Sequence, residues 1–193
     1  MSEIASEAGL TKPALYRSFP NKASLADAFA ERVSLDLGEQ IAQLVREDRP
    51  LREVVHLMIE AFCTQADESP ELFRFLVHGA VGLGRTFEQR RLADAFGRLA
   101  AFALRTTMDR AGIDSAPAET WGYAVVGGIL FTIDWWLTSR PIELAELIEH
   151  LTAAAWALMA RAGAEHFEGP LIDPEQPQIY RSLITGQTEG GPE

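Results

Sequence analysis

Apolar residues recur along most of this chain three or four residues apart, the spacing of an α-helix. The clearest stripe begins at Leu51 and ends at Phe62, and its other members are Val54, Val55, Met58 and Ile59. Because these positions share one face, the segment is predicted to be an amphipathic helix packed on a core. No segment alternates apolar and polar residues with the period of two that marks a β-strand. The pattern therefore predicts an all-α protein.

Glycine, proline and capping residues divide this pattern into separate helices. Gly9 ends a first short helix, Thr11 and Pro13 suit the start of a second, and Pro20 ends it. Asn21 is placed to cap a long third helix. We expect helices over 2–8, 11–19, 22–47, from 51 onward, from 70 onward, and over 86–110, 115–139 and 141–163.

These helices group into a predicted small domain and a larger one. Residues 1–33 hold the two short helices and the start of the third, and residues 34–167 form a larger helical domain. Residues 168–193 are acidic and rich in Pro and Gly, so this tail is expected to be partly disordered.

The two short helices have the arrangement of a helix-turn-helix. A tight turn at Gly9 joins them, and Leu15 and Phe19 form an inward pair four residues apart in the second helix. The other positions then face outward, where the second helix of such a unit reaches base edges and phosphates. The candidate DNA contacts are Thr11, Lys12, Ala14, Tyr16, Arg17 and Lys22. The alternative is an ordinary solvated helix surface.

The distribution of charge is compatible with DNA at this end of the chain. The net charge of −11 argues against a protein that coats nucleic acid generally, because such binding neutralises phosphates. Residues 1–33 carry equal numbers of acidic and basic side chains, so the excess of acid lies downstream. Between residues 11 and 22 there are three basic side chains and no acidic one.

The segment IASEAGLTKPALYRSFPNKASL resembles the helix-turn-helix of the tetracycline repressor family. It contains A-x-x-A-G followed by T-K-x-x-L-Y-x-x-F-x-N-K-x-x-L, whereas the downstream chain is similar only in its helical architecture. The resemblance implies that the six candidate residues lie at or near DNA. It also implies that the last two long helices pack against their counterparts in a second subunit, as a four-helix dimer interface.

Two features depart from the family pattern. Ser24 stands where the family often has Glu, three residues after the cap, and this is expected to weaken the capping box at Asn21. Family members also carry a complete helix before IASEAG, and this chain begins at Met1 without it. We expect either that translation starts upstream of Met1 or that the chain is a shortened relative, whose two short helices lack a third wall.

The segment TWGYAVVGGILFTIDWWL, residues 120–137, fits the expected dimer interface. It is apolar around nearly its whole circumference, which is natural for a helix buried on two sides. Gly127 and Gly128 permit close approach, and the Ala-rich segment ELIEHLTAAAWALMA is the expected counterpart. The alternative is a core helix of a single chain.

A cavity among the remaining helices is predicted to hold a small-molecule effector. Such pockets are mostly apolar with a few polar anchors. The candidate lining residues are Phe62, Phe73, His78, Phe102, Met108, Trp121 and Asp134. A place in the ordinary core is the alternative for each. Asp134 is the best polar candidate, since a carboxylate between Ile133 and Trp135 has to be paired, solvated or waiting for a partner; a hydrogen bond at the dimer interface is its other reading.

Other functional classes lack support in the sequence. Cys63 is the single cysteine, which excludes an internal disulfide and a cysteine-based zinc site, and the histidines form no metal-binding pair. No phosphate loop, nucleophile elbow or paired carboxylates indicate an enzyme or a cofactor. Without a secretory signal or a membrane-spanning apolar run, a cytoplasmic protein is expected.

The sequence thus predicts a homodimeric, ligand-responsive transcriptional regulator that binds a palindromic double-stranded operator, with repression as the expected mode. Effector binding is expected to change the separation of two DNA-reading heads. The alternative is a helical dimer that binds small molecules or proteins and has lost specific DNA binding. The third reading is a helical-bundle enzyme, whose turnover a substitution such as Asp134→Asn should abolish.

Overall fold

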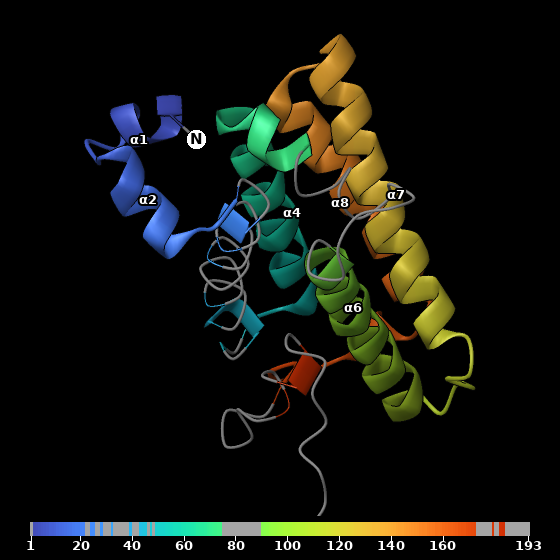
Figure 1. The fold of residues 1–193 in the computed structure, drawn as a ribbon. Coiled ribbons are helices and arrows are strands. Elements are labelled where there is room, and N and C mark those ends of the chain that lie inside the picture. Colours follow the sequence, from blue (N-terminus) through green and yellow to red (C-terminus); the bar gives the residue numbers. More distant parts are fainter. Residues whose placement is uncertain are drawn as a thin grey trace, which may run out of the picture. The chain divides into compact units, whose positions relative to one another are not determined.

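A computed structural model describes residues 2–21, 24–25, 28, 32, 39, 43–45, 47, 49–74, 90–172, 179 and 182–183. Regular structure within these residues is helical throughout, which confirms the predicted all-α class (Figure 1). The chain divides into two compact units, residues 1–37 and 38–193. The named helices are α1 (Ser2–Glu7), α2 (Lys12–Ser18), α4 (Leu51–Glu68), α6 (Arg90–Arg110), α7 (Ala118–Ser139), α8 (Leu144–Arg161) and the 3-10 turn η1 (Ala164–His166).

In the first unit, α1 and α2 are joined by a turn that requires glycine. The Leu10 N–H donates to the Ala5 carbonyl at 2.8 Å, and the Gly9 N–H donates to the Ser6 carbonyl at 3.1 Å. These two hydrogen bonds form a Schellman motif, in which one residue adopts the left-handed conformation, and Gly9 has φ of 64°. Ala5 and Leu15 are buried. The predicted break between the two helices is therefore confirmed.

Local caps start α2 and the segment that follows it. Thr11 occupies the N-cap of α2 with φ −76° and ψ 146°, but its hydroxyl makes no capping hydrogen bond, and Pro13 sits in the first turn. Downstream, the Ser24 N–H donates to Asn21 Oδ1 at 2.8 Å, which confirms the Asn21 cap. Ser24 Oγ accepts the Asn21 N–H at 3.3 Å. Ser24 therefore completes a capping box in place of Glu, and its return hydrogen bond is long.

In the second unit, α6 packs along α7, and α8 packs along α4 (Figure 1). Close approach of α6 and α7 depends on Gly122, because a Cβ there would lie 2.7 Å from the Ala101 Cα. Gly97 lies one turn before Ala101 on α6, and the ring of Tyr123, the residue after Gly122, covers it. The Tyr123 hydroxyl donates to Asp94 Oδ1 at 2.5 Å. Small residues and one hydrogen bond thus fix the α6–α7 contact.

The core of the second unit lies between α4, α7 and α8. Trp136 is its largest fully buried side chain, and the indole Nε1–H donates to the Ile142 carbonyl at 2.8 Å. That bond ties α7 to the connection before α8, where Pro141 breaks the helical pattern as predicted. The other members of the core cluster are Ile59, Cys63, Ala66, Phe73, Ile133, Leu137, Leu147, Ile148, Leu151 and Ala155.

Helix ends differ from the sequence predictions by a few residues. The helix expected from residue 115 begins at Ala118, because the Asp114 carboxylate accepts the Ala116 N–H at 3.0 Å and holds a turn before Pro117. After η1 the chain returns to the start of the unit, where the Ile172 N–H donates to the Val45 carbonyl at 3.4 Å. The predicted start at Thr86 lies outside the described residues.

Candidate functional sites

The outward surface of α2 is set by burial of Leu15, which is 4% exposed. Around it the predicted DNA contacts reach solvent: Thr11, Lys12, Tyr16 and Arg17 are exposed, and Ala14 is half-buried. Among the described residues, Lys12 and Arg17 have no ion-pair partner, so both charges are available to an incoming phosphate. Lys22 lies outside the described residues.

A hollow of about 100 Å³, here called the apolar cavity, lies between α4, α6, α7 and α8. Phe62 and Phe96 meet there edge to face, with ring centroids 4.5 Å apart and planes at 81°. The described residues that line it are all apolar: Leu51, Val54, Val55, Met58, Ile59 and Phe62 of α4, Phe96, Leu99, Ala100 and Ala103 of α6, Val125, Val126, Ile129 and Leu130 of α7, Ala155 and Met159 of α8, and Leu171.

The predicted effector contacts do not gather in one place. Phe62 lines the apolar cavity. Phe73 is buried in the core cluster, Met108 is buried in α6, and Trp121 is half-buried at the start of α7. Phe102 instead borders a separate surface hollow, together with Arg98, Arg105 and Tyr123. His78 lies outside the described residues.

Most cavity walls were missed because the prediction selected aromatic and polar residues one at a time. The α4 wall consists of the apolar stripe from Leu51 to Phe62, the strongest pattern in the sequence. Of that stripe, only Phe62 was named as a candidate lining residue. Its length, extending over six cavity-lining positions of one helix, was the signal that could have located the cavity.

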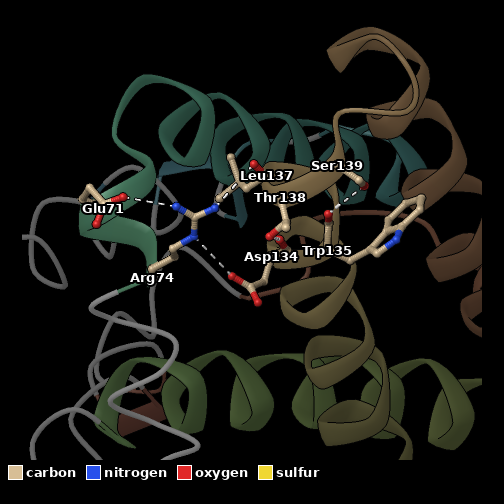
Figure 2. A network of polar contacts seen from close by, with 7 residues as sticks. All are labelled: Glu71, Arg74, Asp134, Trp135, Leu137, Thr138 and Ser139. Atoms are coloured by element: carbon tan, nitrogen blue, oxygen red, sulfur yellow. Dashed lines mark hydrogen bonds and ion pairs between the residues drawn. The ribbon is translucent and has the colours of Figure 1, made fainter.

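Asp134 is paired within the chain rather than placed in the apolar cavity (Figure 2). Its Oδ1 lies 3.7 Å from Arg74 Nε, and Arg74 Nη2 donates to the Leu137 carbonyl at 3.4 Å. Arg74 Nη1 also lies 3.1 Å from Glu71 Oε1. Arg74 therefore links the helical segment at residues 70–74 to the last turns of α7.

The face of α7 opposite the core and cavity is apolar and exposed. Phe131 is 75% exposed and Trp135 49%. One turn before Phe131, Gly127 and Gly128 are exposed as well, and a Cβ at either position meets no atom within 4 Å. On the second half of α8, Ala153, Ala154 and Ala157 are exposed. Exposed large apolar side chains beside two glycines, which leave room for a close neighbour, are typical of a surface that another helix covers.

Among the described residues, the side chains of Cys63 and Tyr123 have a raised pKa. Burial of Cys63 raises the pKa of its thiol to about 12, so the neutral, unreactive form prevails at neutral pH. Burial, followed by the hydrogen bond to Asp94, raises the pKa of Tyr123 to about 12.

The described residues contain no group of His, Cys, Asp and Glu side chains placed to hold a metal ion. Of the described helices, none is long and apolar enough to cross a membrane.

The family comparisons agree with both units. Residues 1–29 match the family model for bacterial regulatory proteins of the tetR family, and residues 40–172 match that for the tetracyclin repressor-like C-terminal domain. The chain belongs to the tetracycline repressor family. The predicted family is thus confirmed, and the protein is a DNA-binding transcriptional regulator from a family of regulators rather than of enzymes.

Proteins similar to this chain include a transcriptional regulator and nucleoid occlusion factors. An uncharacterized HTH-type transcriptional regulator of Mycobacterium tuberculosis, Rv0472c, is 29% identical over 167 residues, which are 82% of this chain and 68% of the relative. The nucleoid occlusion factor SlmA of Vibrio vulnificus is 28% identical over 98 residues, 51% of this chain and 48% of SlmA. SlmA of Haemophilus influenzae is 29% identical over 98 residues, 51% of this chain and 45% of SlmA. No solved structure gives a significant match.

Proposed function

We propose that this family member is a homodimeric repressor that binds a palindromic operator through α2 and responds to a small-molecule effector. The observation that carries the DNA-binding part is the solvent-facing set of Lys12, Tyr16 and Arg17 around the buried Leu15. A helix-turn-helix of this kind places the start of its second helix against base edges in the major groove.

Each proposed DNA contact has a role that follows from its chemistry. Lys12 and Arg17 bind phosphate oxygens or the acceptor edge of guanine, and the Tyr16 hydroxyl donates to a phosphate. The methyl groups of Thr11 and Ala14 contact thymine methyls. Lys22, at the predicted start of the next helix, adds a phosphate contact beside free backbone amides.

The proposed dimer forms through the exposed faces of α7 and α8. Burying Phe131 and Trp135 against a second copy removes large apolar side chains from water, which is the main driving force for association. Gly127 and Gly128 allow the two α7 helices to approach closely. A two-fold dimer then carries two copies of α2 and reads half-sites about 34–36 Å apart, one turn of DNA.

The proposed effector binds in the second unit, with Phe62 as a direct contact. Binding there changes DNA affinity only if the effector prefers one arrangement of the dimer over the other. The change in operator affinity cannot exceed the difference between the effector's affinities for the two arrangements. By linkage, operator binding changes effector affinity by the same factor.

Selection of an operator from a random duplex pool tests this function. Wild-type protein enriches a palindromic duplex, and dissociation constants are then measured for Lys12→Ala, Tyr16→Ala and Arg17→Ala. Each substitution is expected to weaken binding roughly 5- to 150-fold, and loss of a phosphate contact lowers the salt slope by about one. Arg161→Ala, an exposed cation at the end of α8, is the matched control and should leave affinity unchanged.

Two results contradict the proposal in different ways. Unchanged affinity in the three α2 variants removes the assigned DNA face. Robust dimers that enrich no duplex favour the alternative, a dimeric binding module without specific DNA recognition. Repression itself is read from a reporter that carries the enriched duplex, whose transcription should rise when the protein is absent.

A further inference from the structure

We infer that the effector is a small, uncharged hydrocarbon-like molecule, bound in the apolar cavity without a polar anchor. This inference rests on the proposed function, because it names the chemical class of the proposed effector. It depends on three features of the second unit: the composition of the cavity walls, the pairing of nearby polar groups, and the cavity volume.

The wall residues that the structure describes supply no hydrogen-bonding side chain. They consist of Leu, Ile, Val, Met, Phe and Ala from four helices, with Leu171 from the segment after η1. An effector that carried a carboxylate or an ammonium group would lose its hydration without gaining a partner, at a cost of several kcal/mol. A neutral hydroxyl or amide would also be left unsatisfied. The cavity therefore selects against charge and against hydrogen-bonding groups.

Polar side chains on the same helices as the wall residues already have partners within the protein. His56, which follows the cavity residue Val55, has its Nδ1 3.2 Å from Thr152 Oγ1. On α6, the buried Thr107 hydroxyl donates to the Leu104 carbonyl at 2.9 Å. The hydroxyl proton of Thr107 and the Nδ1 of His56 are therefore engaged within the protein. Neither residue is among those that line the cavity.

The volume limits the effector to a molecule of about one ring. The cavity measures about 100 Å³. An engineered apolar cavity of about 150 Å³ in another protein stays dry and binds benzene, so this smaller space takes one ring only when its walls adjust. Met58 of α4 and Met159 of α8 line the cavity, and their flexible side chains can supply that adjustment.

An occupant of this cavity touches the elements that a regulator has to move. Val125, Val126, Ile129 and Leu130 face it from α7, whose other face carries the exposed Phe131. Leu171 lines it from the segment after η1. The N–H of the next residue, Ile172, donates to the carbonyl of Val45, which lies shortly before α4. Filling the cavity therefore acts on the proposed dimer helix and on the entry to α4 through van der Waals contacts alone.

The test compares toluene with benzoate, which have the same ring and differ in a carboxylate. Calorimetry and thermal unfolding are measured on the full chain. Toluene should bind, raise the melting temperature by roughly 3–6 °C at ten times its dissociation constant, and bind at least about a hundredfold more tightly than benzoate.

Two alanine-to-leucine variants of α8 locate the site. Ala155→Leu fills the cavity from a wall position and should abolish toluene binding, whereas Ala145→Leu, at an exposed position of the same helix, should leave it intact. If Ala155→Leu does not fold, Ala100→Leu enters the cavity from α6 at a half-buried position.

The outcomes separate this inference from the function on which it rests. Benzoate binding as tightly as toluene, toluene binding that survives both cavity-filling variants, or no binding of toluene overturns the inference. Each of these results leaves operator binding by α2 untouched. Conversely, failure to enrich any operator duplex removes the proposed function, while toluene binding still establishes the chemical class of ligand that the cavity takes.

Discussion

Substitution of Gly122 by Ala tests the contact between α6 and α7. Gly122 is buried in the second turn of α7, and an added Cβ would lie 2.7 Å from the Ala101 Cα and 2.9 Å from its Cβ. Two of the atoms it meets belong to the backbone of α6, so no side-chain rotation relieves the overlap. The two helices must move apart, and contacts on both sides of Gly122 are lost.

The net effect is the difference between two opposing terms. Alanine is favoured over glycine in a helix interior by about 1 kcal/mol, which alone would stabilise α7. Overpacking a well-packed interior costs about 1–3 kcal/mol, and rigid backbone atoms place this site at the upper end. We expect Gly122→Ala to lower the free energy of unfolding by about 2 kcal/mol, and the melting temperature by roughly 4–8 °C for a chain of this size.

Gly128→Ala is the matched control at protein concentrations low enough to dissociate the proposed dimer, whose interface contains Gly128. It lies in the same helix, and a Cβ there meets no atom within 4 Å, so the propensity gain of up to about 1 kcal/mol stands alone in a single chain. Unfolding is followed by circular dichroism at several protein concentrations. The loss at Gly122 should not depend on concentration, because the overlap lies within one chain. A Gly122→Ala protein as stable as Gly128→Ala would show that Gly122 does not approach the Ala101 backbone as closely as the structure indicates.

Three further substitutions test separate parts of the molecule. Since burial raises the pKa of Cys63 to about 12, against about 8.5 for a free thiol, the unfolded state loses its proton first. The difference in free energy of unfolding between wild type and Cys63→Ala should therefore be constant below about pH 8.5. Between that pH and pH 12, wild type should lose up to about 1.4 kcal/mol per pH unit relative to the variant. If both proteins depend on pH in the same way, this reasoning is wrong. Arg74→Met should cost about 1 kcal/mol in urea unfolding, whereas Glu71→Ala, whose side chain is 91% exposed, should cost close to nothing. Phe131→Ala should weaken dimerisation at least about tenfold by analytical ultracentrifugation without destabilising the monomer, and an unchanged association constant excludes this face from the interface.

The sequence was sufficient for features that depend on neighbouring residues. Gly9 ends α1 because the left-handed turn is local, and Asn21 caps the next segment through a residue three positions away. The burial of Leu15 follows from its place on a short helix and fixes which side chains of α2 face outward. The candidate DNA surface could therefore be predicted residue by residue, apart from Lys22, which lies outside the described residues.

The sequence was insufficient where several distant helices determine the result. Whether Phe73 fills the core or lines a cavity depends on the helices that pack around it, and nothing near it in the sequence decides this. Asp134 illustrates the same limit. Its carboxylate was expected to be paired, solvated or waiting for a partner, because it lies between Ile133 and Trp135. In the structure it is paired, and the partner, Arg74, comes from a segment sixty residues earlier in the chain, which its neighbours in the sequence do not indicate.

The two faces of α7 explain why its sequence is apolar almost all round. Val125 and Ile129 line the cavity, Ile133 and Trp136 fill the core, and Phe131 points away from both. A helix that served one chain alone would have a polar outer face. Because one rigid helix forms a cavity wall and the proposed dimer surface, an effector that shifts it also changes how two copies fit together. By linkage, dimerisation must then change effector affinity by the same factor.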